Sequence, residues 1–121
     1  MHTYSFEKLN IWREIRRLIK EIYDLSNSFP AIERFGLASQ MQRAVISVAS
    51  NIAEGSSRTS YKDQAHFSQI AYSSLMEVLS QIIIAHDLRY ITEEKYKNSR
   101  SMIDNLAAQI SSLRKTQLTK L

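Results

Sequence analysis

Hydrophobic residues recur along this chain with the spacing of α-helices rather than with the alternation of β-strands. In the first segment they fall on one broad face at about 100° per residue, and later segments repeat an apolar residue every three or four positions. The pattern predicts four helices, over residues 6–26, 37–54, 61–88 and 92–116. Because the connections are short, we expect neighbouring helices to pack antiparallel. The predicted fold is therefore an all-α, up-and-down four-helix bundle, with residues 1–121 forming one domain.

Local signals mark where the predicted helices end and begin. Pro30 ends the first helix, because the residue before a proline avoids the helical region. Gly55 stands where a left-handed residue would end the second helix, and the serines after it offer a cap for the third. Thr92 and the two glutamates that follow it give the fourth helix a capped, acidic start.

The third predicted helix is unusually poor in charge. From Gln64 to His86 its only fully charged side chain is Glu77, and its apolar positions spread over more than one face. Two explanations are open: the helix lies centrally and is buried by both neighbours, or a second face packs against another copy of the chain. The second is favoured, because interface cores are depleted of charge and oligomers are usually closed and symmetric.

Composition excludes several classes of protein. The chain has 121 residues, of which 44% are hydrophobic and 23% charged, with two glycines, one proline and no cysteine. Two distant glycines cannot form a phosphate-binding loop, and a chain without cysteine has no thiolate metal site or cysteine nucleophile. No apolar run is long enough to span a membrane, and the N-terminus does not resemble a signal peptide, so we expect a cytoplasmic protein without membrane contact.

The ionisable residues do not form a recognisable catalytic or metal-binding pattern. A di-metal bundle site needs Glu-x-x-His pairs, and no glutamate in this chain is followed by a histidine at that spacing. The reversed pair Asp63 and His66 is interpreted as a surface contact, and no serine is singled out for a catalytic triad. We therefore expect no catalytic residue, no metal site and no cofactor.

Four cations of the first predicted helix, Arg13, Arg16, Arg17 and Lys20, share one side of it. They occupy positions i, i+3, i+4 and i+7, opposite the apolar face, and could follow the phosphates of a nucleic acid. The net charge of +4 permits such a role. Alternatively, Glu14, Glu21 and Asp24 could pair with these cations on a solvated face. We call Arg13, Arg16, Arg17 and Lys20 the cationic stripe; Arg114, Lys115 and Lys120 add positive charge near the C-terminus.

Polar residues of the second predicted helix form another set. Three interpretations are open: a solvated face, a hydrogen-bond network between subunits or a ligand surface. A structural role is favoured over ligand binding. Glu77 is the expected partner of Arg43 if the second and third helices face each other here. The set comprises Gln40, Arg43, Ser47, Ser50, Asn51 and Glu54.

The same helix carries a specific string, Asn51-Ile52-Ala53-Glu54-Gly55, preceded by Gln40-x-x-Arg43-Ala44-x-x-Ser47. This string resembles the signature of the bacterial four-helix-bundle family found in intervening sequences of 23S ribosomal RNA genes. Further pieces follow in the family's order, and the resemblance covers roughly residues 6–90, with the fourth helix similar in pattern only. Among these pieces are Phe6-Glu7-Lys8-Leu9, Glu33-Arg34-Phe35-Gly36-Leu37 and Ile70-Ala71-x-x-Ser74-Leu75-x-Glu77.

The resemblance implies a compact bundle that assembles into a closed homopentamer. A related branch comprises the accessory proteins of diversity-generating retroelements, whose pentamer uses a basic surface to bind RNA and the reverse transcriptase. For the intervening-sequence members themselves the resemblance implies no biochemical role. Where the family often has arginine in Ile-Ala-Arg-Gly-Ser-Leu, this chain has Tyr72, which lowers the positive charge of the third helix.

The sequence thus gives a leading hypothesis and an alternative. The first is a non-catalytic, homo-oligomeric accessory protein that binds nucleic acid, most readily structured RNA. The alternative is a structural or scaffolding homo-oligomer whose partner is another protein, such as a reverse transcriptase. The candidate RNA or DNA contacts are Arg13, Arg16, Arg17, Lys20 and Arg43, and the polar stripe of the family motif is Ser47, Asn51, Glu54 and Glu77.

Overall fold

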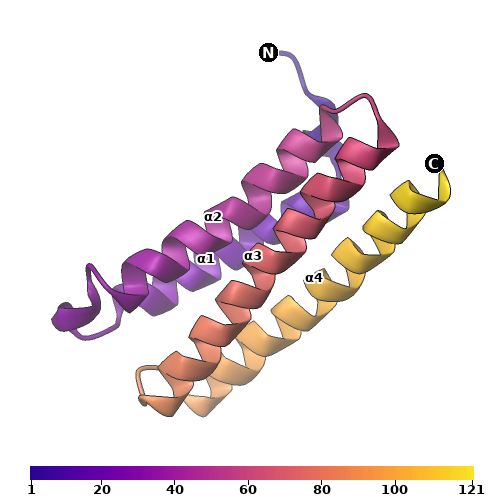
Figure 1. The fold of residues 1–121 in the computed structure, drawn as a ribbon. Helices are drawn as coiled ribbons and strands as arrows, with labels where there is room; N and C mark the ends of the chain where they lie inside the picture. The colour runs from indigo at the N-terminus through magenta and orange to yellow at the C-terminus, as the bar shows by residue number, and fades with distance from the viewer.

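The computed structural model describes residues 1–121 and contains four long helices that run side by side in alternating directions (Figure 1). The all-α four-helix bundle predicted from the hydrophobic pattern is confirmed. The α1–α2 and α3–α4 connections lie at one end of the bundle, whereas both termini and the α2–α3 connection lie at the other (Figure 1). The elements are η1 (Ser5–Lys8), α1 (Asn10–Asn27), η2 (Ala31–Glu33), α2 (Leu37–Ser56), α3 (Tyr61–Asp87) and α4 (Glu93–Thr119).

The first helix begins later than predicted. Residues 5–8 form a short 3₁₀ turn, and Leu9 is extended, with φ −74° and ψ 125°, before α1 starts at Asn10. The turn is closed by the Glu7 carboxylate, which accepts a hydrogen bond of 2.7 Å from the Tyr4 backbone N–H. At the other starts the predicted caps are confirmed: Ser60 accepts from the Asp63 N–H at 3.1 Å, and Thr92 from the Lys95 N–H at 3.2 Å.

The prediction that Gly55 is left-handed is wrong. Gly55 lies inside α2 and is buried, and no glycine in the chain has a positive φ. A Cβ on Gly55 would lie 2.9 Å from the Cβ of Phe67 on α3, so the glycine is needed for the close approach of these two helices. The left-handed residue is Arg89 instead, with φ 61°, where the Tyr90 N–H donates to the Ala85 carbonyl at 2.9 Å and ends α3.

One hydrophobic core runs the length of the bundle. α3 packs against both α2 and α4, and α1 packs against α2 and less extensively against α4. The third helix is thus buried by both neighbours along its core face, as the less favoured of the two explanations states. Its outer surface still exposes apolar side chains, including Ile84, which is 45% exposed. Fully buried core residues include Ile15, Leu18, Val48, Leu75, Ile82, Ile103 and Ile110.

None of the four helices is both long enough and apolar enough to cross a lipid bilayer.

Candidate nucleic-acid interface

The four residues of the cationic stripe are all exposed on α1. Their side chains share one side of the helix because positions three, four and seven residues apart lie above one another. Arg13 and Lys20 are separated by about 10 Å along the axis, at 1.5 Å per residue. One strand of a nucleic-acid duplex presents a phosphate about every 3.4 Å of axis, so the stripe spans about three phosphate spacings and can reach about four successive phosphates.

Two arginines of the stripe are held by contacts with the start of the chain. Nε of Arg13 donates to the Glu7 carbonyl at 3.2 Å, and the terminal nitrogens of its guanidinium have no partner within the chain. The Arg16 guanidinium carbon lies 5.3 Å from the ring centroid of Trp12, a cation–π contact. Trp12 in turn packs edge-on against Phe6, with centroids 4.9 Å apart. η1 therefore orients part of the stripe.

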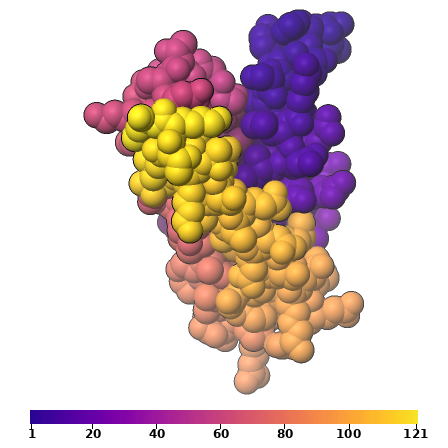
Figure 2. Space-filling view, turned by 90° about the vertical axis from the view of Figure 1, so that its right-hand side faces the viewer, coloured from indigo at the N-terminus to yellow at the C-terminus, as the bar shows by residue number.

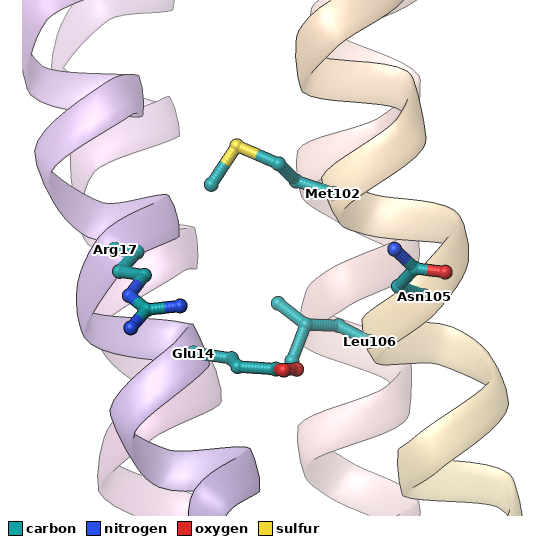
Figure 3. Close-up of a pocket in the computed structure, with 5 residues that line it drawn as sticks. All are labelled: Glu14, Arg17, Met102, Asn105 and Leu106. Carbon is teal, nitrogen blue, oxygen red and sulfur yellow. The ribbon is translucent and has the colours of Figure 1, made fainter.

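Arg17 lies beside the seam between α1 and α4. Figure 3 shows Glu14 and Arg17 of α1 opposite Met102, Asn105 and Leu106 of α4, around a cavity of about 160 Å³. The space-filling view shows α4 along this side of the molecule, with the N-terminal segment beside the C-terminal end of the helix (Figure 2). The positive charge of Arg17 is thus at the edge of a shallow notch rather than on a flat surface.

The acidic residues of α1 do not neutralise the stripe, contrary to the alternative in which they pair with it. The only ion pair within 4.0 Å in the molecule joins His86 and Glu93, whose Nε2 and Oε2 atoms are 2.6 Å apart. Glu14 turns towards α4, where its carboxylate accepts a hydrogen bond from the Gln109 amide. The charges of the stripe are therefore open to solvent and to a ligand.

The polar stripe of the family motif divides into two parts. Ser47 Oγ lies 2.9 Å from Ser74 Oγ across the α2–α3 seam, and the Asn51 amide donates to the Ser47 carbonyl at 2.8 Å. The contact between Ser47 and Ser74 joins α2 to α3 within one chain, whereas the hydrogen bond of Asn51 stays within α2. Glu54 is exposed outside this network, and Glu77 accepts instead from the Gln81 amide at 3.2 Å. Sequence reasoning missed Ser74 as the partner, although the family-like string Ser74-Leu75-x-Glu77 contains it.

The expected pairing of Arg43 with Glu77 is wrong. Both side chains are exposed, and no ion pair or hydrogen bond joins them, because each points outward from its own helix. Arg43 makes no ion pair with any carboxylate, and it lies on α2, whereas the cationic stripe is on α1. It remains a separate candidate contact on the outer surface of α2.

The C-terminal cations lie against α3 rather than beside the stripe. Arg114 and Lys115 line a cavity together with Tyr72 and Gln69, so Tyr72 stands beside an arginine from α4. Nζ of Lys120 lies 5.2 Å from the ring centroid of Tyr61. The cationic stripe and the C-terminal cations therefore lie on two separate surfaces, α1 and the α3–α4 groove.

The histidines and tyrosines have structural partners. The ring of His86 stacks on Tyr96 at 4.0 Å, and no group of three or more acidic or histidine side chains is arranged to hold a metal ion. The Tyr90 hydroxyl donates to the Glu33 carboxylate at 2.8 Å. This hydrogen bond raises the pKa of Tyr90 above its usual value of about 10, with desolvation and the charge of Glu33 adding to the effect.

The comparisons with known proteins agree with the fold and the motif. A crystal structure from Bacteroides thetaiotaomicron, of a protein of unknown function from the S23 ribosomal protein family, is similar with a TM-score of 0.81 and 20% identity. The alignment covers 87% of this chain and 98% of that one. No curated protein matches the chain. The model of the 23S rRNA-intervening sequence protein family matches residues 7–112, including much of α4, and the chain belongs to this family.

Proposed function

We propose that this protein is a non-catalytic, homo-oligomeric accessory protein that binds structured RNA through α1. The observation that carries the proposal is the cationic stripe: four exposed cations within about 10 Å of helix, none of them paired with a carboxylate within 4.0 Å. Unpaired cations at this spacing gain most from contact with phosphates, because binding releases the counterions of the nucleic acid. The name of the family, which refers to 23S rRNA, is consistent with an RNA partner.

Self-association is part of the proposal. Along its outer surface α3 carries serines and isoleucines, with Glu77 as the single carboxylate between Gln64 and His86, and α2 exposes Ile46. Apolar and uncharged side chains of this kind suit the core of an interface between copies of the chain. We propose a closed homopentamer, the assembly that the family resemblance implies. In such a ring α1 would remain outside the interface.

The test is a fluorescence-polarisation titration of a labelled structured RNA at low and at physiological salt. If each residue of the stripe contacts one phosphate, the logarithm of the association constant should fall by about 2.8 to 3.6 per logarithmic unit of salt. Reversing three charges together, Arg13→Glu, Arg16→Glu and Arg17→Glu, should abolish binding. Circular dichroism should show an unchanged helical content, because all three side chains are exposed.

A matched control separates the site from the total charge. Lys62→Glu, Lys95→Glu and Lys97→Glu change the net charge equally at exposed positions on α3 and α4. This variant should retain most of the affinity for RNA. Equal losses in the two triple variants would mean that only net charge matters, and unchanged binding after reversal of the α1 charges would contradict the proposed site.

The alternative is a scaffolding homo-oligomer whose partner is another protein. The exposed apolar residues of α3 favour it, since Ile83 and Ile84 are 36% and 45% exposed and could contact a partner as well as a second copy. This alternative predicts RNA binding that disappears at physiological salt. Sedimentation of the variants Ile46→Asp and Ile84→Asp distinguishes the two uses of the surface: loss of the oligomer assigns it to self-association.

A further inference from the structure

A groove lies at the end of the bundle where α1 connects to α2, away from the cationic stripe. Its volume is about 680 Å³, within the range of pockets that hold small organic ligands. The groove is lined by the end of α1, the η2 turn and the first turns of α2. Neither the notch beside Arg17 nor the cavity beside Tyr72 is as large, at about 160 Å³ and 270 Å³.

An aromatic ring on the wall of this groove is almost fully exposed. Phe35 is 88% exposed, whereas aromatic side chains usually bury most of their surface. The guanidinium carbon of Arg34 lies 5.4 Å from the ring centroid, so a planar cation accompanies the ring. The chain provides no further cover for the phenyl face, and this leaves an aromatic surface beside a positive charge.

The rest of the groove combines the apolar Phe29, Pro30, Ala31 and Ala38 with polar side chains, and no carboxylate lines it. Ser26, Asn27, Ser39 and Gln42 line it, and the Gln42 amide donates to Ser26 Oγ at 2.9 Å. The nearby Glu33 carboxylate is occupied elsewhere, since it accepts from the Tyr90 hydroxyl at 2.8 Å and from the Leu37 N–H at 3.3 Å. Arg34 is therefore the only charged residue that lines the groove, and its charge is not compensated.

These features together match the parts of a nucleotide. A nucleobase stacks readily on an exposed aromatic ring, amide and hydroxyl groups can hydrogen-bond to its edges, and a guanidinium binds the phosphate. An apolar protein side chain would use the ring but would leave the charge of Arg34 without a partner, whereas the phosphate of a nucleotide would pair with it. The chemistry of the lining therefore favours a base over a peptide.

We propose that the groove binds an unpaired nucleotide of the RNA, with the base stacked on Phe35 and the phosphate next to Arg34. This inference rests on the proposed RNA-binding function and extends it. The cationic stripe contacts the backbone of a paired region without reading its structure, whereas Phe35 can be reached only by a base that has left its helix. The protein should consequently distinguish a loop or bulge from a continuous duplex.

The experiment compares the affinities of the 121-residue chain for two RNA probes. One is a hairpin with five unpaired purines in its loop, one of them 2-aminopurine, and the other is a fully paired duplex with the same stem. The wild-type protein should bind the hairpin more tightly and change the fluorescence of 2-aminopurine. The variant Phe35→Ala should weaken hairpin binding by about 5- to 150-fold, the range expected for the loss of one stacked base. Its affinity for the duplex should not change.

Two further variants serve as controls. Ile32→Ala truncates a neighbouring apolar side chain that is 86% exposed but does not line the groove, and it should leave both affinities unchanged. Phe35→Trp keeps an aromatic face and should keep the preference for the hairpin. The oligomeric state of every variant is measured by sedimentation.

The outcomes separate this inference from the proposed function. If Phe35→Ala leaves the ratio of hairpin to duplex affinity unchanged while reversal of the α1 charges abolishes binding, the groove inference is overturned and the RNA-binding function stands. Dissociation of the oligomer in Phe35→Ala would also overturn it, because the ring would then be a contact between protein chains. If the wild-type protein binds neither probe, both proposals are overturned.

Discussion

The α2–α3 seam and the α1–α4 seam of this bundle are built differently. Across the first, Gly55 lets the helices approach closely beside Phe67, and Ser47 lies 2.9 Å from Ser74. Across the second the packing is less extensive, and Glu14 and Arg17 stand beside a cavity. Small uncharged side chains join one pair of helices, and long charged side chains border the other.

We expect the α2–α3 seam to supply most of the stability, and the α1–α4 seam to carry exposed charge. The closely packed α2–α3 pair contributes much of the core, so we expect it to determine the free energy of unfolding. The α1–α4 seam keeps charged groups near solvent, where they cost little to maintain and remain available to a ligand. Substitutions in the two seams should therefore have effects of very different size.

The largest effect is expected in the core of the α2–α3 pair. Leu75 is fully buried, and Leu75→Asp would place an unpaired charge among apolar side chains, at a cost of at least about 4 kcal/mol. Val48→Asp should act in the same way. Since small domains have only about 5–15 kcal/mol of stability, this cost removes a large part of it, and circular dichroism should record a much lower midpoint of thermal unfolding for both variants. Ser73→Asp on the exposed side of α3 should remain folded.

At Gly55 we expect a smaller change in the free energy of unfolding, and the sign of this change shows whether the close contact with Phe67 matters. At an exposed helical site, glycine to alanine stabilises by up to about 1 kcal/mol. Here the new Cβ would lie 2.9 Å from the Cβ of Phe67, which cannot move away without its backbone. We expect Gly55→Ala to destabilise by about 1–3 kcal/mol, and Gly55→Val by more. Urea unfolding measures this, and a gain in stability would show that α2 and α3 separate at little cost.

An increase in stability is expected at Gln81. This residue of α3 is 6% exposed, and its Oε1 is buried without a hydrogen-bond partner. Because an unsatisfied buried polar atom costs about 1–3 kcal/mol, Gln81→Leu should raise the free energy of unfolding by about 1 kcal/mol. Thermal unfolding would record a higher midpoint. A lower midpoint would mean that the hydrogen bond from Gln81 to Glu77 stabilises the fold by more than the unpaired Oε1 destabilises it.

The α1–α4 seam should respond weakly. Glu14→Ala removes the acceptor of the Gln109 amide, but both side chains are only half-buried, so water can replace the lost partner. We expect a loss below about 1 kcal/mol. The same variant removes one negative charge beside the stripe and should tighten RNA binding slightly. A loss as large as that in Gly55→Ala would contradict the contrast between the seams.

The smallest effect depends on pH. Because the pKa of Tyr90 is raised in the folded state, its hydrogen bond to Glu33 contributes stability below the unfolded pKa of about 10. That contribution is lost as the pH rises through the folded pKa. Tyr90→Phe should therefore be less stable than the wild type near neutral pH, and the difference should shrink above pH 10. Unfolding curves at several alkaline pH values measure it, and a constant difference would exclude the linkage.

The bundle could be predicted from the sequence because amphipathic spacing determines which side of each helix is buried. The caps at Ser60 and Thr92 were predictable for a similar reason, since they depend on residues within one turn. The role of Gly55 could not be predicted in this way, because glycine suits both a left-handed helix end and a close contact between helices. Only the position of Phe67 on a distant segment decides between them.

The candidate site shows the same limit. The spacing of Arg13, Arg16 and Arg17 places them on one side of α1 in any helix, so the stripe was predictable. Whether nearby carboxylates would pair with it depends on α4, where Gln109 binds Glu14. Phe35 was visible only as part of a family-like string, and its exposure depends on how the η2 turn is held by Tyr90.

The placement of the chain ends has a practical consequence. Both termini and the exposed α2–α3 connection lie at the end of the bundle opposite the Phe35 groove (Figure 1). A tag at either terminus, or a circular permutant opened between Arg58 and Ser60, would therefore keep all new chain ends on that side. Attached to a sensor surface in this way, the protein would present the groove outward to the RNA in solution.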